Sequence, residues 1–103
     1  MTYRVFYSVE AEAHLNEIYT YIVAAGSPTR AAAFVEDIVA ACEALCVFPD
    51  RGRKRNDLRV GLRTISFRKR VTIVFEVDND EVNIVGILYA GRAYESALRK
   101  GDE

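Results

Sequence analysis

Basic side chains that could bind an anion are concentrated in one short part of this chain. Nine of the fourteen Lys and Arg residues fall between positions 51 and 70, with a single acid, Asp57, among them. They are Arg51, Arg53, Lys54, Arg55, Arg59, Arg63, Arg68, Lys69 and Arg70. Because the whole chain has a formal net charge of -1, the positive charge is segregated and should create a local positive field. The segment therefore predicts an anionic partner: nucleic acid, a nucleotide or an acidic protein segment.

Arginine side chains in this segment have the geometry to bind phosphates or carboxylates through two parallel hydrogen bonds. Pairing of antiparallel strands is expected to bring Arg63, Arg68 and Arg92 near one another, with Tyr89 beside them. A tyrosine there could stack on a base, or act as an acid or base if its pKa of about 10 were lowered. The alternative is a solvated, charged sheet edge that discourages aggregation. The number of charges favours partner binding.

Other signatures of catalysis are missing from the sequence. It contains no GxxxxGK[ST], GxSxG or HExxH motif. His14 is the only histidine and is expected on a solvated helix face. Cys42 and Cys46, four positions apart in a helical pattern, are interpreted as small core residues and not as a metal or redox pair. We therefore expect no metal and no cofactor. Any catalysis would be metal-independent cleavage of a phosphodiester by its own 2′-hydroxyl, with charge stabilised by Arg and Tyr.

The size of the chain indicates one folded domain over residues 1–103. Half of the residues are hydrophobic, which is typical of a folded protein. No apolar run approaches the roughly 20 residues that span a bilayer, and the N-terminus lacks the hydrophobic region of a signal peptide. A cytoplasmic protein without a membrane partner is expected.

The first half of the chain predicts a strand and two helices. Tyr3–Ser8 alternates as a strand does, and Ser8 can then cap a helix. Apolar residues recur at helical spacing as far as Gly26. Ser27 and Pro28 are a favourable start for a second helix, which ends before Phe48 and Pro49. The short connection implies a helical hairpin with its apolar faces turned the same way.

The second half predicts a basic loop followed by strands. The polar residues 50–61 are interpreted as a partner-facing loop. Leu62–Phe67, Arg70–Val77 and Val82–Tyr89 should be three consecutive antiparallel strands, and Ala93–Lys100 a short terminal helix. The fold class is therefore α+β, in the order β-α-α-β-β-β, with the helical hairpin on one face of an antiparallel sheet. The other face would be partly open.

The order of these segments resembles that of a known family. Its marks are Tyr7-Ser8-Val9-Glu10-Ala11, Ile18-Tyr19-Thr20-Tyr21-Ile22, Phe48-Pro49-Asp50-Arg51-Gly52, Leu58-Arg59-Val60-Gly61-Leu62-Arg63, Val71-Thr72-Ile73-Val74-Phe75 and Ile87-Leu88-Tyr89-Ala90-Gly91-Arg92. Together they resemble the RelE/ParE superfamily of toxins from bacterial type II toxin-antitoxin systems. The long helical hairpin and the Gly-Leu-Arg and Tyr-Ala-Gly-Arg segments are more similar to the ParE branch.

This resemblance implies a toxin that is neutralised by a cognate antitoxin, whose extended tail folds on binding and often carries acids. ParE-like members inhibit DNA gyrase, and we expect the same here, without specific DNA binding by the toxin itself. The first alternative is a RelE-like endonuclease that cleaves mRNA in the ribosome, and the second is a degenerate toxin that only binds its antitoxin. The nuclease would use Arg63, Arg68 and Arg92 with Tyr89 or Tyr94.

The residues expected to bind the target or the antitoxin are basic and come from the loop, the strands and the C-terminal segment. They are Arg51, Arg53, Arg55, Arg59, Arg63, Arg68, Arg70 and Arg92. Arg63 and Arg68 are preferred because strands, rather than a mobile loop, would hold them in place. Replacing Arg63 or Arg92 by alanine is expected to abolish toxicity and to keep the fold, because exposed arginines contribute little to stability.

Overall fold

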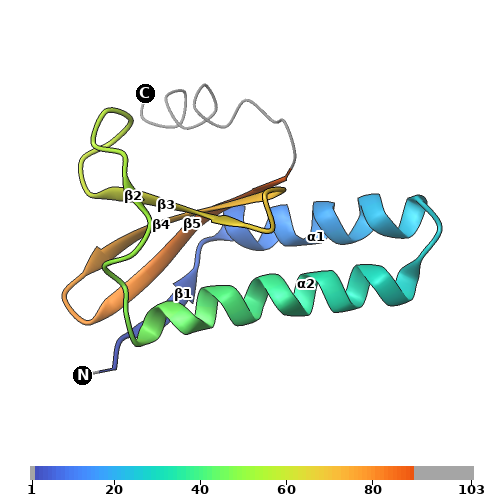
Figure 1. The fold of residues 1–103 in the computed structure, drawn as a ribbon, viewed down its shortest axis with the longest axis horizontal. Helices are drawn as coiled ribbons and strands as arrows, with labels where there is room; N and C mark the ends of the chain where they lie inside the picture. The colour runs from blue at the N-terminus through green and yellow to red at the C-terminus, as the bar shows by residue number, and fades with distance from the viewer. Residues whose placement is uncertain (1, 90–103) are drawn as a thin grey trace.

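The computed structural model describes residues 2–89 (Figure 1). The elements are β1 (Arg4–Tyr7), α1 (Val9–Ala24), α2 (Pro28–Glu43), the short 3-10 helix η1 (Ala44–Cys46), β2 (Arg53–Lys54), β3 (Leu62–Phe67), β4 (Val71–Asp78) and β5 (Glu81–Tyr89). This order confirms the expected α+β fold. Arg92, Tyr94 and the expected helix Ala93–Lys100 lie outside the described residues.

The strands form one five-stranded sheet in the order β1-β5-β4-β3-β2. The antiparallel meander β3-β4-β5 is as expected. β1, however, pairs with β5 in parallel, with Tyr7 opposite Ile84, so the sheet is mixed and not wholly antiparallel. A hairpin turn fixes the relative direction of consecutive strands, whereas nothing local fixes it for strands this far apart in the chain. The loop expected at residues 50–61 also contributes β2 to the sheet.

Local side-chain caps begin both helices of the hairpin, as the sequence predicts. Ser8 Oγ accepts a hydrogen bond from the Ala11 amide at 2.9 Å at the start of α1. Ser27 Oγ accepts one from the Arg30 amide at 3.2 Å, and Pro28 opens α2. Each cap satisfies an amide that the first helical turn leaves without a partner. Gly26, with φ of +111°, makes the connection between the helices.

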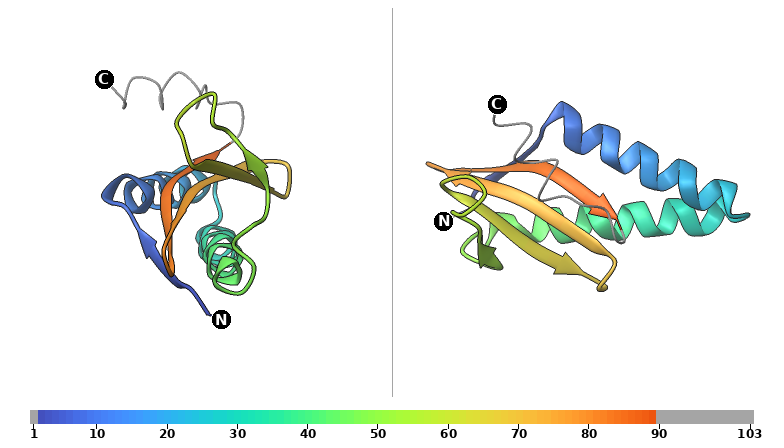
Figure 2. Two further views of the ribbon diagram at one scale, coloured as in Figure 1. Left: turned by 90° about the vertical axis from the view of Figure 1, so that its left-hand side faces the viewer. Right: turned by 90° about the horizontal axis from the view of Figure 1, so that it is seen from above.

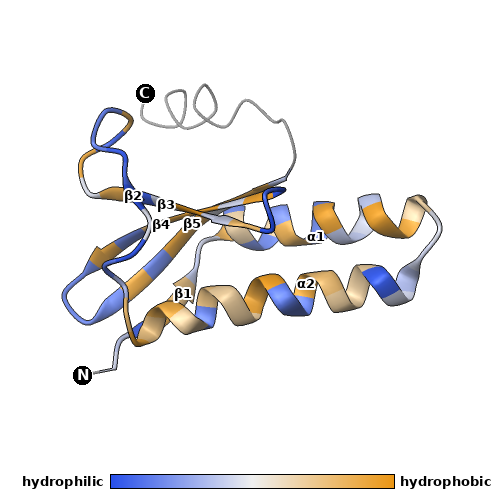
Figure 3. Ribbon diagram, viewed as in Figure 1, coloured by the Kyte–Doolittle hydropathy of each residue, from blue (hydrophilic) through white to orange (hydrophobic). Residues whose placement is uncertain are grey.

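The main core lies between the helical hairpin and the sheet (Figures 1 and 3). Ile38 of α2 and Phe75, Ile84 and Ile87 of the sheet are fully buried there. A second cluster buries Leu58, Leu62, Val74 and Leu88. Leu62 and Val74 are 0% exposed, so this second cluster covers part of the face that was expected to be partly open. The reason is that Leu58, from the β2–β3 connection, packs with strand residues.

α1 also completes the edge of β5 beyond the end of β1 (Figure 2). Ser8 Oγ donates a hydrogen bond to the Val85 carbonyl at 2.9 Å, and His14 Nδ1 accepts one from the Ile87 amide at 3.1 Å. The expectation that His14 lies on a solvated face is therefore wrong. A strand edge that loses its neighbour still has backbone groups to satisfy, and His14 meets that need from the helix.

Candidate functional site

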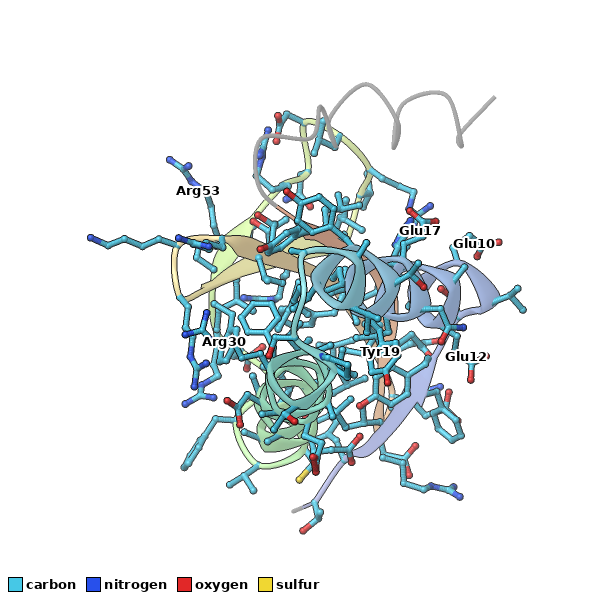
Figure 4. The ribbon with its side chains drawn as sticks, turned by 90° about the vertical axis from the view of Figure 1, so that its right-hand side faces the viewer. Glu10, Glu12, Glu17, Tyr19, Arg30 and Arg53 are labelled. Carbon is cyan, nitrogen blue, oxygen red and sulfur yellow. The ribbon has the colours of Figure 1, made fainter. Side chains whose placement is uncertain are left out.

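The basic segment lies on one side of the molecule, away from the acids of α1. We define the basic lobe as residues 50–70, which comprise most of the connection from η1 to β3, including β2, together with β3 itself and the β3–β4 turn. Figure 4 shows Arg53 of this lobe and Arg30 of α2 on one side, with Glu10, Glu12 and Glu17 of α1 on the other. The positive field expected from the sequence is thus directed to one side of the fold.

The loop part of the basic lobe is packed and not the mobile loop expected from the sequence. The Arg55 amide donates to the Leu62 carbonyl at 2.8 Å, and the Gly61 amide donates to Asn56 Oδ1 at 2.9 Å. Leu58 is only 7% exposed. These contacts tie the loop to the sheet and hold its arginines in place alongside those of the strands.

Gly52 allows the lobe to lie close against β3. Its φ is +75°, and a Cβ at this position would lie 2.2 Å from the backbone oxygen of Thr64. Only glycine adopts this backbone conformation readily and leaves room for such an approach. Gly52 therefore brings Arg53 into register opposite Thr64 on β3.

Acids neutralise four of the nine basic residues of the lobe. The pairs are Arg55–Asp57 at 2.9 Å, Arg59–Glu76 at 2.9 Å, Arg63–Asp50 at 3.3 Å and Arg68–Asp37 at 2.8 Å. Asp50, Asp37 and Glu76 come from the loop start, α2 and β4, outside the 51–70 stretch in which only Asp57 is found. Folding therefore adds acids that the local sequence does not contain.

The remaining five basic residues of the lobe are exposed, and none of them forms an ion pair within residues 2–89. They are Arg51, Arg53, Lys54, Lys69 and Arg70. An approaching anion meets these charges without first having to displace an acid from residues 2–89. Among the arginines expected to bind a partner, Arg51, Arg53 and Arg70 are therefore the ones whose charge is available for binding.

Arg63 and Arg68, the preferred residues, have different environments. The Arg63 side chain is 17% exposed. It contacts Asp50 and also donates to the Arg51 carbonyl at 3.4 Å, so it fastens the start of the lobe. The Arg68 side chain is 56% exposed, and its guanidinium lies 4.9 Å from the centre of the Phe67 ring. Arg63 is therefore a largely enclosed structural contact, and Arg68 is a surface group.

The residues proposed for a nuclease are not brought together among residues 2–89. Tyr89 packs its ring against Phe34 and Tyr21, with centroids 5.9 and 5.7 Å away. Phe34 also contacts Phe67, next to Arg68, so Tyr89 and Arg68 lie at the same end of the sheet. Arg63 lies four residues before Phe67 on β3, which places it about 13 Å along the strand. The remaining two nuclease candidates, Arg92 and Tyr94, lie outside the described residues.

A cluster that the sequence did not indicate joins β1 to the end of α2. Tyr7 donates its hydroxyl proton to Glu43 Oε2 at 2.6 Å. Burial, the hydrogen bond to Glu43 and nearby negative charge raise the pKa of Tyr7 above its ordinary value. Burial, together with the Glu43 carboxylate, raises the pKa of Cys42 to about 12. Both groups stay protonated at neutral pH, so this cluster holds the fold together and offers no nucleophile.

Metal and membrane features are not found in the described part of the chain. Within residues 2–89, no group of three or more His, Cys, Asp or Glu side chains is arranged to hold a metal ion. Cys42 and Cys46 are both free thiols. No helix in the same range has the length and apolar character to cross a membrane.

Comparison with known proteins decides the family. The sequence model described as "ParE toxin of type II toxin-antitoxin system, parDE" matches residues 3–94. The chain belongs to this ParE toxin family. Among solved structures, a chain of the "Chromosomal ParDE TA system from P. aeruginosa" is similar, with a TM-score of 0.76 and 26% sequence identity. The similarity covers 86% of this chain and 97% of that one. No curated protein sequence matches significantly. The resemblance to the ParE branch is confirmed.

Proposed function

We propose that this ParE-family toxin stops growth by acting on DNA gyrase and that a cognate antitoxin neutralises it. The observation that carries the proposal is the match to the ParE toxin model over residues 3–94. It spans both helices and every strand, so it concerns the whole fold and not one motif. The similarity to a chain of a ParDE system gives further support.

The charge and apolar surface of the chain support an acidic, partly apolar antitoxin tail. The five exposed basic residues of the lobe offer a field for acids. Val47 and Phe48, just before the lobe, are 53% and 67% exposed. Large apolar side chains exposed side by side are typical anchors for a partner. A tail that folds on binding would place apolar residues on these two side chains and acids along the lobe.

The arrangement of the arginines favours an inhibitor over a nuclease. Arg63 and Arg68 each contact an acid of the same chain, which reduces the charge available to stabilise a cleaving phosphate. Arg63 is also separated along β3 from the end of the sheet that holds Tyr89. A toxin that binds its target through a surface does not need these residues to converge.

The test is a DNA supercoiling assay with purified full-length chain and gyrase. We expect the chain to inhibit supercoiling or to trap cleaved DNA, and an equimolar antitoxin from the adjacent reading frame to restore activity. Gyrase that works normally at saturating toxin would overturn the proposal. Translation-dependent mRNA fragments on expression would instead identify the RelE-like nuclease. Expression without the antitoxin and without harm would identify a degenerate toxin.

A matched pair of variants tests the antitoxin surface. Arg53→Glu reverses an unpaired charge of the lobe, and Arg30→Glu reverses an exposed charge of α2 on the same side of the molecule. We expect Arg53→Glu to weaken antitoxin binding about tenfold or more, and Arg30→Glu to weaken it much less. Titration calorimetry of the two variants measures the difference. Equal losses would show that general attraction, and not the lobe, guides the antitoxin.

A further inference from the structure

A polar hollow opens beside the short strand β2. It has a volume of about 300 Å³ and is lined by Gly52, Arg53, Arg55, Thr64, Ile65, Ser66 and Thr72. The strand register explains this grouping, because Arg53 lies opposite Thr64 and Ser66 lies opposite Thr72. Side chains directly opposite each other in an antiparallel pair share a face of the sheet. The hollow is therefore assembled from three strands.

The lining of the hollow consists mainly of hydrogen-bond donors. Thr64, Ser66 and Thr72 each carry a hydroxyl, and within residues 2–89 none of these hydroxyls has a protein partner. Thr64 is only 7% exposed, and since no buried side-chain oxygen in the described range lacks a partner, the exposed part of this residue must include its hydroxyl. Arg53 adds a guanidinium without an ion pair in the described range. Among the described residues, no acid lines the hollow.

The position of the two arginines is fixed by the backbone. Gly52 permits the close approach to the Thr64 carbonyl, and the Arg55 amide is bonded to Leu62. The Arg55 guanidinium contacts both carboxylate oxygens of Asp57, at 3.0 and 2.9 Å. The Arg55 side chain thus lines the hollow in a position fixed by Asp57, whereas the Arg53 guanidinium is available to a ligand. A site whose donors are held before binding loses less entropy when the ligand arrives.

We propose that this hollow is an oxyanion site that takes a phosphate group. Several hydroxyl donors and one free guanidinium converge on it, and a phosphate offers more acceptor oxygens than the two of a carboxylate. Arginine forks match phosphate geometry and bind it through charge-assisted hydrogen bonds. The volume is at the lower end of the roughly 300–1,000 Å³ found for small-molecule sites, which suits a phosphate with a small attached group. The site is independent of the cellular target proposed above.

The charge balance around the hollow supports an anion and excludes a cation. Asp50, Asp57 and Glu76 are engaged by Arg63, Arg55 and Arg59. Arg51 and Lys54 are the chain neighbours of Gly52 and Arg53, and both are exposed. A bound phosphate therefore experiences a net positive field from the lobe, while a cation would be repelled.

The test uses the full-length chain and NMR titration of backbone amides with inorganic phosphate, a nucleoside monophosphate, a short single-stranded oligonucleotide and acetate. We expect saturable shifts at Arg53, Thr64, Ser66 and Thr72 with the phosphate probes and none of comparable size with acetate. The probe that binds most tightly identifies the source of the phosphate. Equal binding of acetate, or shifts confined to other residues, would overturn the proposal.

Matched variants separate the site from the general charge of the lobe. Arg53→Ala removes the free guanidinium, and Lys54→Ala removes the adjacent charge, whose side chain points to the opposite face of the strand and does not line the hollow. We expect Arg53→Ala to weaken phosphate binding about tenfold or more and Lys54→Ala to change it less than about twofold at 0.15 M salt. Equal losses of phosphate affinity in the two variants would show that the hollow is not a specific site.

A second variant keeps the test decisive if Arg53→Ala disturbs β2. Thr72→Val removes one hydroxyl from the hollow while keeping the branched shape that suits a strand. We expect phosphate binding to weaken severalfold with an unchanged melting temperature. Unchanged phosphate binding in this variant would show that the hollow is not the site, whatever Arg53→Ala does to β2.

Discussion

At the residue scale, the acid beside each arginine determines which charges can meet a partner. Four arginines of the lobe contact Asp57, Glu76, Asp50 and Asp37, and these contacts lower the charge that they present. The acid of each pair is 34–86% exposed; ion pairs that are open to solvent in this way add little stability through their charge, so their main effect is on recognition. The five unpaired basic residues are consequently the better candidates for contact with an anionic partner.

Arg63 and Arg68 should differ in their contribution to stability, although the sequence suggested that Arg63 is exposed and can be replaced with little loss of stability. Arg63→Ala removes a largely enclosed side chain that contacts Asp50 and the Arg51 carbonyl. We expect it to lower the free energy of unfolding by about 1 kcal/mol, and Arg68→Ala to lower it by less than about 0.5 kcal/mol. Urea denaturation measures both. A larger effect for Arg68 would show that Arg63 does not fasten the lobe.

Alkaline pH should destabilise the fold through the cluster of Tyr7 and Cys42. The ordinary pKa of 9.0 for Cys42 rises to about 12 on folding, and the pKa of Tyr7 rises from 10.0. Between the unfolded and folded pKa values, the unfolded chain loses protons that the folded chain keeps. The free energy of unfolding therefore falls as pH rises above about 9, by up to about 1.4 kcal/mol per pH unit for each group.

Two cysteine variants test this dependence on pH. Cys42→Ala removes the buried thiol, so the slope of stability between pH 9 and pH 11 should become shallower even if the variant is less stable overall. Cys46→Ala removes the other, half-buried thiol and serves as the matched control for the loss of a cysteine as such. Denaturation midpoints measured across this pH range give the slope for the original chain and for each variant. Parallel slopes for all three proteins would contradict the assignment to Cys42.

At the element scale, both edges of the sheet gain hydrogen-bond partners from segments that no hydrophobic periodicity in the sequence marks as strands. β2 is a two-residue strand that joins β3 from within the basic loop. At the other edge, Ser8 and His14 bond the part of β5 that β1 does not reach. Both arrangements satisfy backbone groups that an open edge would expose. The result is a sheet that holds the basic lobe at one edge and has α1 beside the other, with the helical hairpin covering one face.

Gly52 and Gly61 provide a matched test of how the lobe is held. Both have positive φ, +75° and +85°, but an added Cβ at Gly61 would have nothing within 4 Å, whereas at Gly52 it would meet the Thr64 oxygen. Gly61→Ala should lower the free energy of unfolding by about 1–2 kcal/mol, because alanine is strained at a positive φ. Gly52→Ala should lower it by roughly 1–3 kcal/mol more, because the added Cβ would also clash with the Thr64 oxygen. Thermal melts and hydrogen exchange of β2 and β3 measure this. Equal costs would show that the close approach is unimportant.

At the scale of the whole molecule, the fold converts a nearly neutral chain into one with two oppositely charged sides. The net charge is only -1, yet the basic lobe and the glutamates of α1 point away from each other (Figure 4). A separation of charge of this kind orients an approaching partner before contact. An acidic antitoxin tail should therefore reach the lobe in preference to the helical face.

The rate of association with the antitoxin should depend on this separation of charge. The double variant Arg53→Glu/Lys54→Glu should slow association about tenfold or more, and Glu10→Lys/Glu12→Lys should leave it unchanged or faster. Raising salt should slow the original chain and reduce the difference between variants. Stopped-flow measurements at two ionic strengths test this. Rates that do not respond to salt would show that apolar contacts alone control the encounter.

Much of the fold follows from the sequence because its determinants are local. Ser8 and Ser27 cap their helices with the amides three positions ahead, and short turns join β3, β4 and β5 into a meander. The same ordered segments indicated the ParE branch, and the family match confirms it. A cap, a turn or an alternating strand depends on neighbours in the chain, so residue types and spacing are enough to predict it.

Other features depend on contacts between residues that are far apart in the sequence, and only the tertiary structure reveals them. Periodicity placed His14 in solvent, whereas its partner is the Ile87 amide, 73 positions away. Neither the parallel pairing of β1 with β5 nor the bond from Tyr7 to Glu43 has a local signal. The basic segment was visible from the start, but the acids that neutralise Arg63 and Arg68 lie 13 and 31 positions away. Long-range contacts of this kind depend on how the elements pack, which no single stretch of the chain encodes.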